Sequence, residues 1–248
     1  MSEQKTADIL KIDPYMAIPQ ADENGITYHS PFEEPFRLGG SAFQDQVGHQ
    51  FRRIPAEPFV SGGVEYLAWD TAGFQLQFKS TSKRVMIKAE LREGTLMHHM
   101  PQTGSSSFDL YVGGPGNWRL VQAARYQLHA TEFTAELFNR EEPGLREYLI
   151  NFPLYNAVKS VFIGLESDAE IYAPTPWSHD KPVVVYGTSI TQGGCASHPG
   201  GAWTNLLSRW HNCEFYNMGF SGNGRGEPAA AEILASIPNP RCFILDYE

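Results

Sequence analysis

The chain has 248 residues, of which 28 are acidic and 19 basic, and its formal net charge is −9. This length can bury one large hydrophobic core or two cores of ordinary size. The acidic balance argues against nucleic acid or an anionic membrane as the main partner, so a neutral or sugar-like partner fits better. Three cysteines without Cys-x-x-Cys spacing indicate neither a disulfide framework nor a zinc knuckle.

Residues 1–23 read as a polar N-terminal extension. They contain no apolar run of the length that a signal peptide needs. No later segment approaches the ~18 apolar residues of a membrane-spanning helix. We therefore expect a cytoplasmic protein.

Residues 24–173 read as a β-rich domain. The run Phe74–Lys79 alternates apolar and polar side chains, which predicts a strand with one face on a core and the other in water. Turns such as Ser61-Gly62-Gly63 separate the β-rich runs. The further runs are 85–91, 108–112, 148–152 and 160–165. Many short strands with almost no helical periodicity predict an antiparallel β-sandwich of the jelly-roll type.

The sequence pattern changes after residue 173. Residues 174–182 contain three prolines and are interpreted as an extended linker. Beyond them, strands at 183–186, 214–218 and 242–245 alternate with two helices. One helix carries Trp203, Leu206, Leu207 and Trp210 on one face, and the other spans 227–235. This order predicts a parallel, doubly wound α/β sheet of the flavodoxin type, of which 183–248 supply the first half and stop after the third strand.

The first strand-to-helix loop, YGTSITQGG, places Ser189 directly after an apolar strand. A Gly-x-Ser-x-Gly nucleophile elbow would need glycine where Thr191 stands, and a phosphate-binding loop would need a lysine. The residues alone leave a nucleophilic serine and an ordinary turn both open.

The second strand-to-helix loop, NMGFSGNGRG, spans residues 217–226. Its glycines let backbone N–H groups approach a charged or polarised oxygen. Gly222-x-Gly224 followed by Asp246 also matches part of a dinucleotide-binding pattern. The third glycine, Gly226, comes one place early for that pattern, and the loop belongs to the second strand–helix unit rather than the first.

Together, the two loops resemble the SGNH (GDSL-type) hydrolases, in the branch where a β-sandwich precedes the hydrolase domain. Gly187-Thr188-Ser189-Ile190-Thr191 resembles the family's first block, and Asn217-x-Gly219-x-x-Gly222-Asn223 resembles the second. The segment 97–111 resembles the N-terminal domain of that branch. The resemblance implies a catalytic set of Ser189, Gly222 and Asn223, with Ser189 as nucleophile and the amides of Ser189 and Gly222 in the oxyanion hole. It implies neither a metal nor an organic cofactor.

Parts of the family pattern are missing from the chain. Thr188 stands where the family has aspartate, and neither the third-block asparagine nor an Asp-x-x-His block occurs in the 248 residues. A serine needs a base to take its proton. His198 and His211 are interpreted as surface residues, and the neighbours His98 and His99 as strand residues on opposite faces, which makes a poor metal site.

We therefore expect this chain alone to be inactive or severely impaired. We also expect it to continue in its gene, or to be completed by a fragment or by self-association with another copy, because a parallel sheet stopped at its third strand leaves an open edge.

The resulting hypothesis is a serine carboxylic-ester hydrolase that removes an acetyl or other acyl group from a carbohydrate or small-molecule ester. Two alternatives stay open. One is an acyltransferase that uses the same acyl-serine intermediate. The other is a non-catalytic fragment whose sandwich binds carbohydrate or a partner, for example through the glycine-rich loop 113–118.

Overall fold

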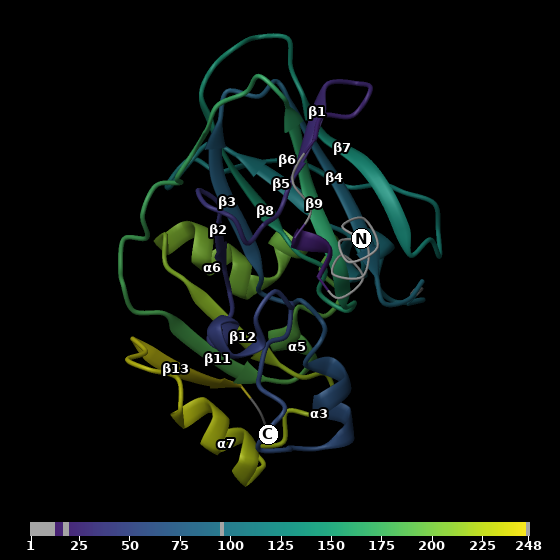
Figure 1. Ribbon diagram of the computed structural model, residues 1–248. Coiled ribbons are helices and arrows are strands. Elements are labelled where there is room, and N and C mark those ends of the chain that lie inside the picture. The colour runs from purple at the N-terminus through teal and green to yellow at the C-terminus, as the bar shows by residue number, and fades with distance from the viewer. Residues whose placement is uncertain (1–12, 17–19, 95–96, 247–248) are drawn as a thin grey trace, which may run out of the picture.

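The computed structural model describes residues 13–16, 20–94 and 97–246. Antiparallel strands fill the upper half of Figure 1, and a parallel sheet with its helices fills the lower half. Of the extension expected at 1–23, only residues 13–16 and 20–23 are described. Residues 247–248 lie outside the described residues. Within the described part, no helix has the length and apolar character needed to cross a membrane.

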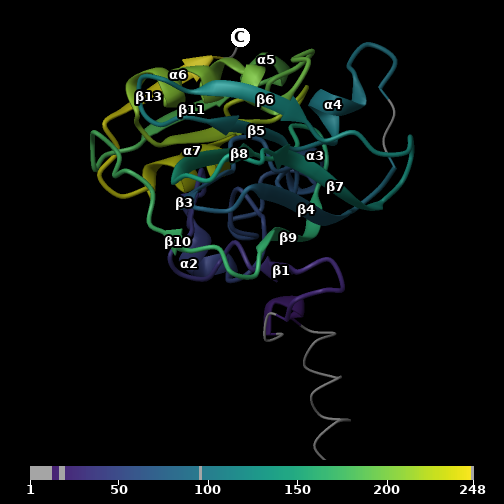
Figure 2. The same cartoon turned by 90° about the horizontal axis from the view of Figure 1, so that it is seen from above.

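The upper half consists of two antiparallel sheets in two layers (Figure 2). The first has the order β1 (Ile26–His29), β9 (Val158–Glu166), β4 (Arg84–Leu91) and β7 (Glu132–Asn139). The second has the order β10 (Ile171–Tyr172), β3 (Gln75–Ser80), β8 (Arg146–Asn151), β5 (Asp109–Val112) and β6 (Arg119–Ala123), with β2 (Arg37–Gly39) also paired to β3. One hydrophobic core joins the layers, with Phe78 from the second sheet and Ile87 from the first.

The β-rich character predicted for this region is confirmed. Each of the five predicted runs forms a strand within two residues of its predicted bounds. The runs that became β1, β2, β6 and β7 were not singled out. Short helices interrupt the strands: the 3-10 helix η1 (Pro14–Met16), α2 (Gln44–Val47), α3 (Gly62–Leu67) and α4 (Gln102–Ser105).

The polar face of β3 is not in water, contrary to the prediction from its alternating pattern. Gln75 and Gln77 are 4% and 2% exposed. Arg37 of β2 donates to the side-chain oxygen of Gln77 at 3.1 Å, and Ser208 of helix α6 (Trp203–His211) donates to that of Gln75 at 3.0 Å. The alternation is real, but its polar face meets another layer of protein.

The lower half is built on a parallel sheet in the order β12 (Phe215–Gly219), β11 (Val183–Gly187) and β13 (Cys242–Asp246). Gly187 pairs in register with Gly219 on one side and Asp246 on the other, so three carboxyl ends meet at one edge. The connections contain α5 (Ser189–Gln192), the 3-10 helix η2 (Pro199–Gly201), α6 and α7 (Pro228–Ala235). The predicted parallel strands and both predicted helices are confirmed.

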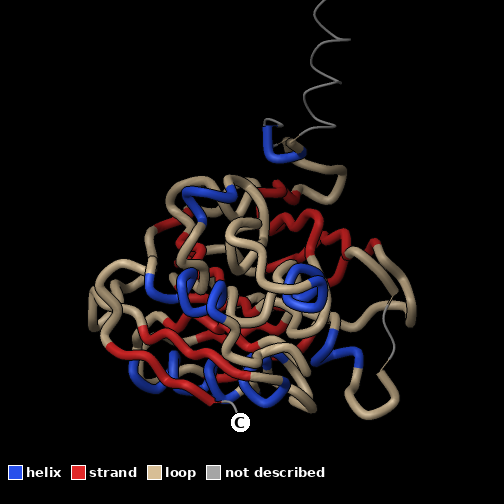
Figure 3. The backbone as a smooth tube through the Cα atoms, turned by 90° about the horizontal axis from the view of Figure 1, so that it is seen from below, coloured by secondary structure: helices blue, strands red, loops and turns tan. Residues whose placement is uncertain are grey.

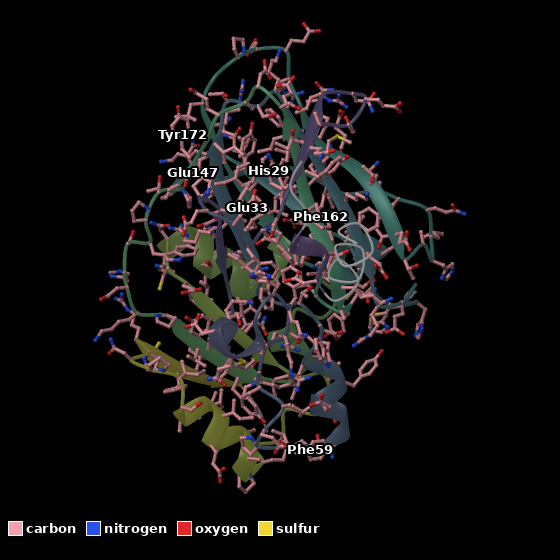
Figure 4. All side chains as sticks on the ribbon, in the orientation of Figure 1. His29, Glu33, Phe59, Glu147, Phe162 and Tyr172 are labelled. Atoms are coloured by element: carbon pink, nitrogen blue, oxygen red, sulfur yellow. The ribbon has the colours of Figure 1, made fainter. Side chains whose placement is uncertain are left out.

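Residues 42–68, between β2 and β3, pack mostly on the parallel sheet, although Phe51 belongs to the sandwich core. Phe43, Ile54 and Val64 share a buried cluster with Val184 of β11 and Ile233 of α7. Figure 4 shows Phe59 of this segment at the lower end of the molecule, far from His29, Glu33 and Phe162 of the sandwich half. Seen from below, helices of this layer lie over the strands (Figure 3).

The predicted turn at Ser61-Gly62-Gly63 is wrong for a local reason. Ser61 is the N-cap of α3, and its side chain accepts a hydrogen bond from the Val64 amide at 3.2 Å. A serine followed by two glycines is typical of turns, but here the serine satisfies a free amide of the first helical turn.

Helix α6 buries a different face from the one expected. Thr204, Asn205 and Ser208 are buried, Thr204 against Asn217 of β12 and Ser208 against Gln75 of the sandwich, whereas Trp210 is 70% exposed. Trp203 and Leu207 are partly buried against Val183 and its neighbours in the parallel sheet. The helix lies between two protein layers, so its polar face is buried as well.

A chain of buried hydrogen bonds joins the two halves. One Asp109 carboxylate oxygen accepts from the Gly200 amide at 2.5 Å, and the other accepts from the Asn151 side chain at 2.6 Å. Gln75 donates to Asn151 at 2.9 Å and accepts from Ser208. Burial raises the pKa of Asp109 to about 6, against the effect of these donors.

We expect Asp109→Asn to loosen this junction. Asparagine has one acceptor oxygen, so its amide nitrogen must face either the Gly200 N–H or the Asn151 side-chain donor. Measured by urea unfolding well above the pKa of Asp109, the free energy of unfolding should fall by about 1–3 kcal/mol. The exposed Asp45→Asn should change it by less than about 0.5 kcal/mol. Equal unfolding midpoints for the two variants would refute the assigned role of Asp109.

Candidate active site

Ser189 is the first residue of α5, directly beyond the carboxyl end of the central strand β11. Its side chain is at the surface of the fold and half-buried, and the next residue, Ile190, is 64% exposed. Its carbonyl oxygen accepts hydrogen bonds from the Gly194 amide at 2.7 Å and from the Tyr155 hydroxyl at 3.0 Å. The sequence predicted the position of Ser189 but gave no sign of Tyr155, which comes from the sandwich.

The structure brings the loop of Gly222 and Asn223 beside the loop of Ser189. The Phe220 amide donates to the Gly187 carbonyl at 2.9 Å, which ties the end of β12 to the end of β11. Gly222 is exposed and has φ of +67°. The Asn223 side chain donates to the Ser221 carbonyl at 2.8 Å, so it braces its own loop.

Gln192 connects the two loops to the sandwich, although no motif in the sequence marks it as a functional residue. It lies three residues after Ser189 and is 0% exposed. Its side-chain oxygen accepts from the Ser221 amide at 2.9 Å. Its side-chain nitrogen donates to Asp70 and to the Leu154 carbonyl, each at 3.0 Å. No sequence spacing could have linked it with Asp70, because the two are far apart in the chain.

Asp70 is itself held in a charged, buried setting. It is 2% exposed, and its other carboxylate oxygen accepts from Arg92 at 3.0 Å. Burial raises the pKa of Asp70 to about 6, although the positive charges of Arg53 and Arg92 act in the opposite direction. Both of its oxygens accept hydrogen bonds from side-chain donors, Arg92 and Gln192, as an ionised carboxylate does.

Arg53 links residues 42–68 to the end of β12. It is fully buried and donates to the Asn217 and Gly219 carbonyls at 3.1 and 2.6 Å, and to the Leu67 carbonyl at 2.6 Å. Burial lowers the pKa of its guanidinium to about 10, which leaves it charged at neutral pH. One cation thus holds α3 against the strand that leads into the second loop.

The histidines lie in three different settings. His198 is half-buried at the junction of the two halves, where its ring contacts the Tyr111 hydroxyl at 3.0 Å and Ser197 at 2.9 Å, so its interpretation as a surface residue is wrong. Burial lowers its pKa. His211 is exposed, as expected.

His98 and His99 form the middle of a turn between Met97 and Met100, not a strand, and their ring centroids are 5.1 Å apart. Among the described residues, no histidine forms a hydrogen bond with Ser189. Across the described residues, no three His, Cys, Asp or Glu side chains are grouped to hold a metal.

Asp246, which the sequence places in a partial dinucleotide-binding pattern, accepts a hydrogen bond from the Thr191 hydroxyl at 2.9 Å. It thereby fastens α5 to the end of β13. The edge where three strands end therefore presents a serine hydroxyl beside a glycine-rich loop with backbone N–H groups. Such an arrangement suits a nucleophile next to donors for a developing oxyanion.

Comparisons with known proteins identify the family of the chain. Residues 26–171 match the family described as the N-terminus of SGNH-hydro-type esterases (GxDLY), and residues 180–247 match the GDSL-like lipase/acylhydrolase family. The first match covers more than half of the chain. The chain therefore belongs to the SGNH-type esterases with this N-terminal domain. The motif that gives the family its name is Gly-x-Asp-Leu-Tyr. In this chain Asp109-Leu110-Tyr111 match the motif, and Ser107 stands where it has glycine.

Several solved structures are similar. A protein described as a GDSL-like lipase from Bacteroides ovatus is 30% identical, with a TM-score of 0.81, and the match covers 90% of this chain and 64% of that one. A salicylyl-acyltransferase from a tetracycline biosynthetic pathway is 18% identical, with a TM-score of 0.66 and coverage of 90% and 62%. A family two carbohydrate esterase from Cellvibrio japonicus is 14% identical, with a TM-score of 0.51 and coverage of 81% and 53%.

The last two similarities show the fold alone. No curated protein sequence matches the chain. The chain spans less than two thirds of the length of each of the three similar structures.

Two glycines of the second loop should respond differently to alanine. A Cβ on Gly224 would lie 2.0 Å from the Gly187 carbonyl oxygen, whereas a Cβ on Gly222 would meet nothing within 4 Å. Gly222→Ala should therefore cost only the left-handed backbone penalty, about 1–2 kcal/mol. Gly224→Ala must push the two loops apart and should lower the free energy of unfolding further, which urea titration of both variants measures. A larger loss for Gly222→Ala would contradict the packing described.

Proposed function

We propose that this chain carries the nucleophile and part of the oxyanion hole of a serine carboxylic-ester hydrolase. The observation that supports it is the placement of Ser189 at the carboxyl end of the central strand, with the loop of Gly222 fastened beside it. Ligands of open α/β sheets bind at this edge. Membership of the SGNH-type esterases supports the same chemistry.

In the proposed reaction, the Ser189 hydroxyl oxygen attacks the ester carbonyl carbon while its proton passes to a base. The negative charge that develops on the carbonyl oxygen is stabilised by the backbone N–H groups of Ser189 and Gly222. Collapse of the tetrahedral intermediate breaks the ester bond, releases the alcohol with a proton and leaves an acyl-serine. Water then attacks the acyl group and regenerates Ser189.

The base is the missing component. Ser189 has no histidine partner among the described residues, and no Asp-x-x-His occurs in the sequence. A serine hydroxyl is a weak nucleophile without an adjacent base. We propose that residues outside these 248 supply it, and that the 248-residue chain alone turns over esters very slowly or not at all.

The finer architecture is part of the proposal. The order second, first, third strand is the order with which a flavodoxin-like sheet begins. We propose a jelly-roll-like sandwich at 24–173, a linker at 174–182 and an α/β domain from 183. Most of residues 42–68 pack against this α/β domain although they precede it in the chain.

The outer edge of the parallel sheet supports completion by further chain. Phe243 and Leu245 of β13 are 43% and 60% exposed, and with Leu234 of α7 they line a groove of ≈ 300 Å³. We propose that a further segment of the same protein, or another copy, covers this groove.

For the substrate we propose a carbohydrate ester, and for the protein a cytoplasmic location. A carbohydrate esterase shares the fold, which supports but does not decide the substrate class. Transfer of the acyl group to an acceptor hydroxyl is the second candidate, because a salicylyl-acyltransferase shares the fold and the two reactions differ only in the second nucleophile.

Ser189→Ala in the full-length protein should abolish hydrolysis of p-nitrophenyl acetate, because it removes the hydroxyl that we propose attacks the ester. Rate losses on the order of 10⁴-fold or more are expected when a triad nucleophile is removed. Ser236→Ala, which removes a hydroxyl at the end of α7, is the matched control and should keep the wild-type rate.

Turnover that survives Ser189→Ala would exclude the esterase proposal. If the wild-type protein shows no turnover but binds sugars, the non-catalytic alternative, in which the sandwich binds carbohydrate through a loop such as 113–118, takes its place.

A further inference from the structure

The orientation of the Gln192 side-chain amide is fixed by its partners. Asp70 and the Leu154 carbonyl offer only acceptor oxygens, so both require the amide nitrogen of Gln192. The amide oxygen must then face the other way, where the Ser221 amide is the donor at 2.9 Å. A reversed amide would set oxygen against two acceptors and nitrogen against a donor.

We propose that Asp70 and Gln192 are positioning residues for the oxyanion loop: the sandwich carboxylate orients the Gln192 amide, and this amide holds the Ser221 N–H away from the substrate. The inference rests on the proposed esterase function and deepens it. It assigns to the sandwich a part in catalysis, through residues that touch neither the ester nor Ser189 Oγ.

The bond to Ser221 determines which amide is left for the substrate. The Ser221 N–H donates to Gln192. The loop turns at the next residue, Gly222, which has a left-handed backbone with φ of +67°. A preorganised donor costs no reorganisation when charge develops in the transition state. Gln192 holds this turn from a helix that begins at Ser189, so the nucleophile and the loop share one support.

Asp70 is suited to orient Gln192 because it cannot itself turn. Its second oxygen is held by Arg92, which also donates to the Tyr66 carbonyl at 3.1 Å and lies over the Tyr66 ring at 4.0 Å. The Asp70 carboxylate is 2% exposed, so no solvent competes for it. Hydrogen bonds of a charged acceptor are roughly twice as strong as neutral ones.

The test uses Gln192→Met, Asp70→Asn and the double variant in the full-length protein. Methionine keeps the approximate length but offers the Ser221 amide no oxygen. We expect kcat for p-nitrophenyl acetate to fall on the order of 10- to 100-fold, below the loss from deleting an oxyanion donor, with KM within about twofold.

With Asp70→Asn, the introduced asparagine has one acceptor for two donors, so Gln192 can reverse and kcat should fall by about 5- to 10-fold. If Asp70 acts through Gln192, the double variant should lose less than about twofold beyond Gln192→Met alone. Ser208→Ala is the matched control, since it removes a buried hydrogen bond between the same two halves but away from the loops. Its kcat should stay within about twofold of wild type even if its thermal stability falls.

Hydrogen exchange of the Ser221 amide gives a readout that does not need activity and can be made on the 248-residue chain. Gln192→Met and Asp70→Asn should each speed that exchange at least about tenfold, while Ser208→Ala should not. Unchanged exchange, or independent losses of kcat in the double variant, would overturn the inference. Faster exchange in a protein without Ser189-dependent turnover would keep the positioning role and reject the esterase proposal.

Discussion

Asp109 and Gln75 point away from the sandwich core and into the α/β half, where they accept hydrogen bonds from the Gly200 amide and the Ser208 hydroxyl. Buried polar groups are costly unless they are paired, so this surface can be buried only in the geometry that pairs it. Hydrophobic contact alone would allow many relative placements of the halves. The hydrogen-bonded junction permits one, and the positions of α6 and of the loop after α5 depend on it.

The same junction explains which sequence predictions succeeded. Strands such as β3 and β4 could be predicted because alternation reports a strand whatever covers its polar face. The protein layer that covers the polar face of β3 could not be predicted. The alternating pattern is the same whether the Gln77 side chain contacts water or Arg37. Likewise, the periodicity predicted helix α6, but not that Ser208 would be buried and Trp210 exposed.

For the candidate site, the sequence predicted the residues that a loop motif carries and missed those that tertiary contact supplies. Ser189 and Gly222 lie in short glycine-containing loops after apolar strands, which is a local signal. Asp70, Arg53 and Tyr155 come from loops of the β-rich region and reach the parallel sheet only because residues 42–68 and the end of β8 pack against it. No local pattern encodes that crossing.

Helix α5 shows why such support is required. Four residues are far below the length at which a helix holds its own shape in water, because nucleation is unfavourable and too few hydrogen bonds follow it. The geometry of Ser189 must therefore come from the partners of the helix: Tyr155 on the Ser189 carbonyl, Asp246 on Thr191, and the Asp70 and Ser221 contacts of Gln192. Two of these four partners, Tyr155 and Asp70, belong to the sandwich. As the proposed nucleophile, Ser189 would need preorganised surroundings to lower a barrier, so the proposed function makes the sandwich part of the catalytic unit rather than a separate binding module.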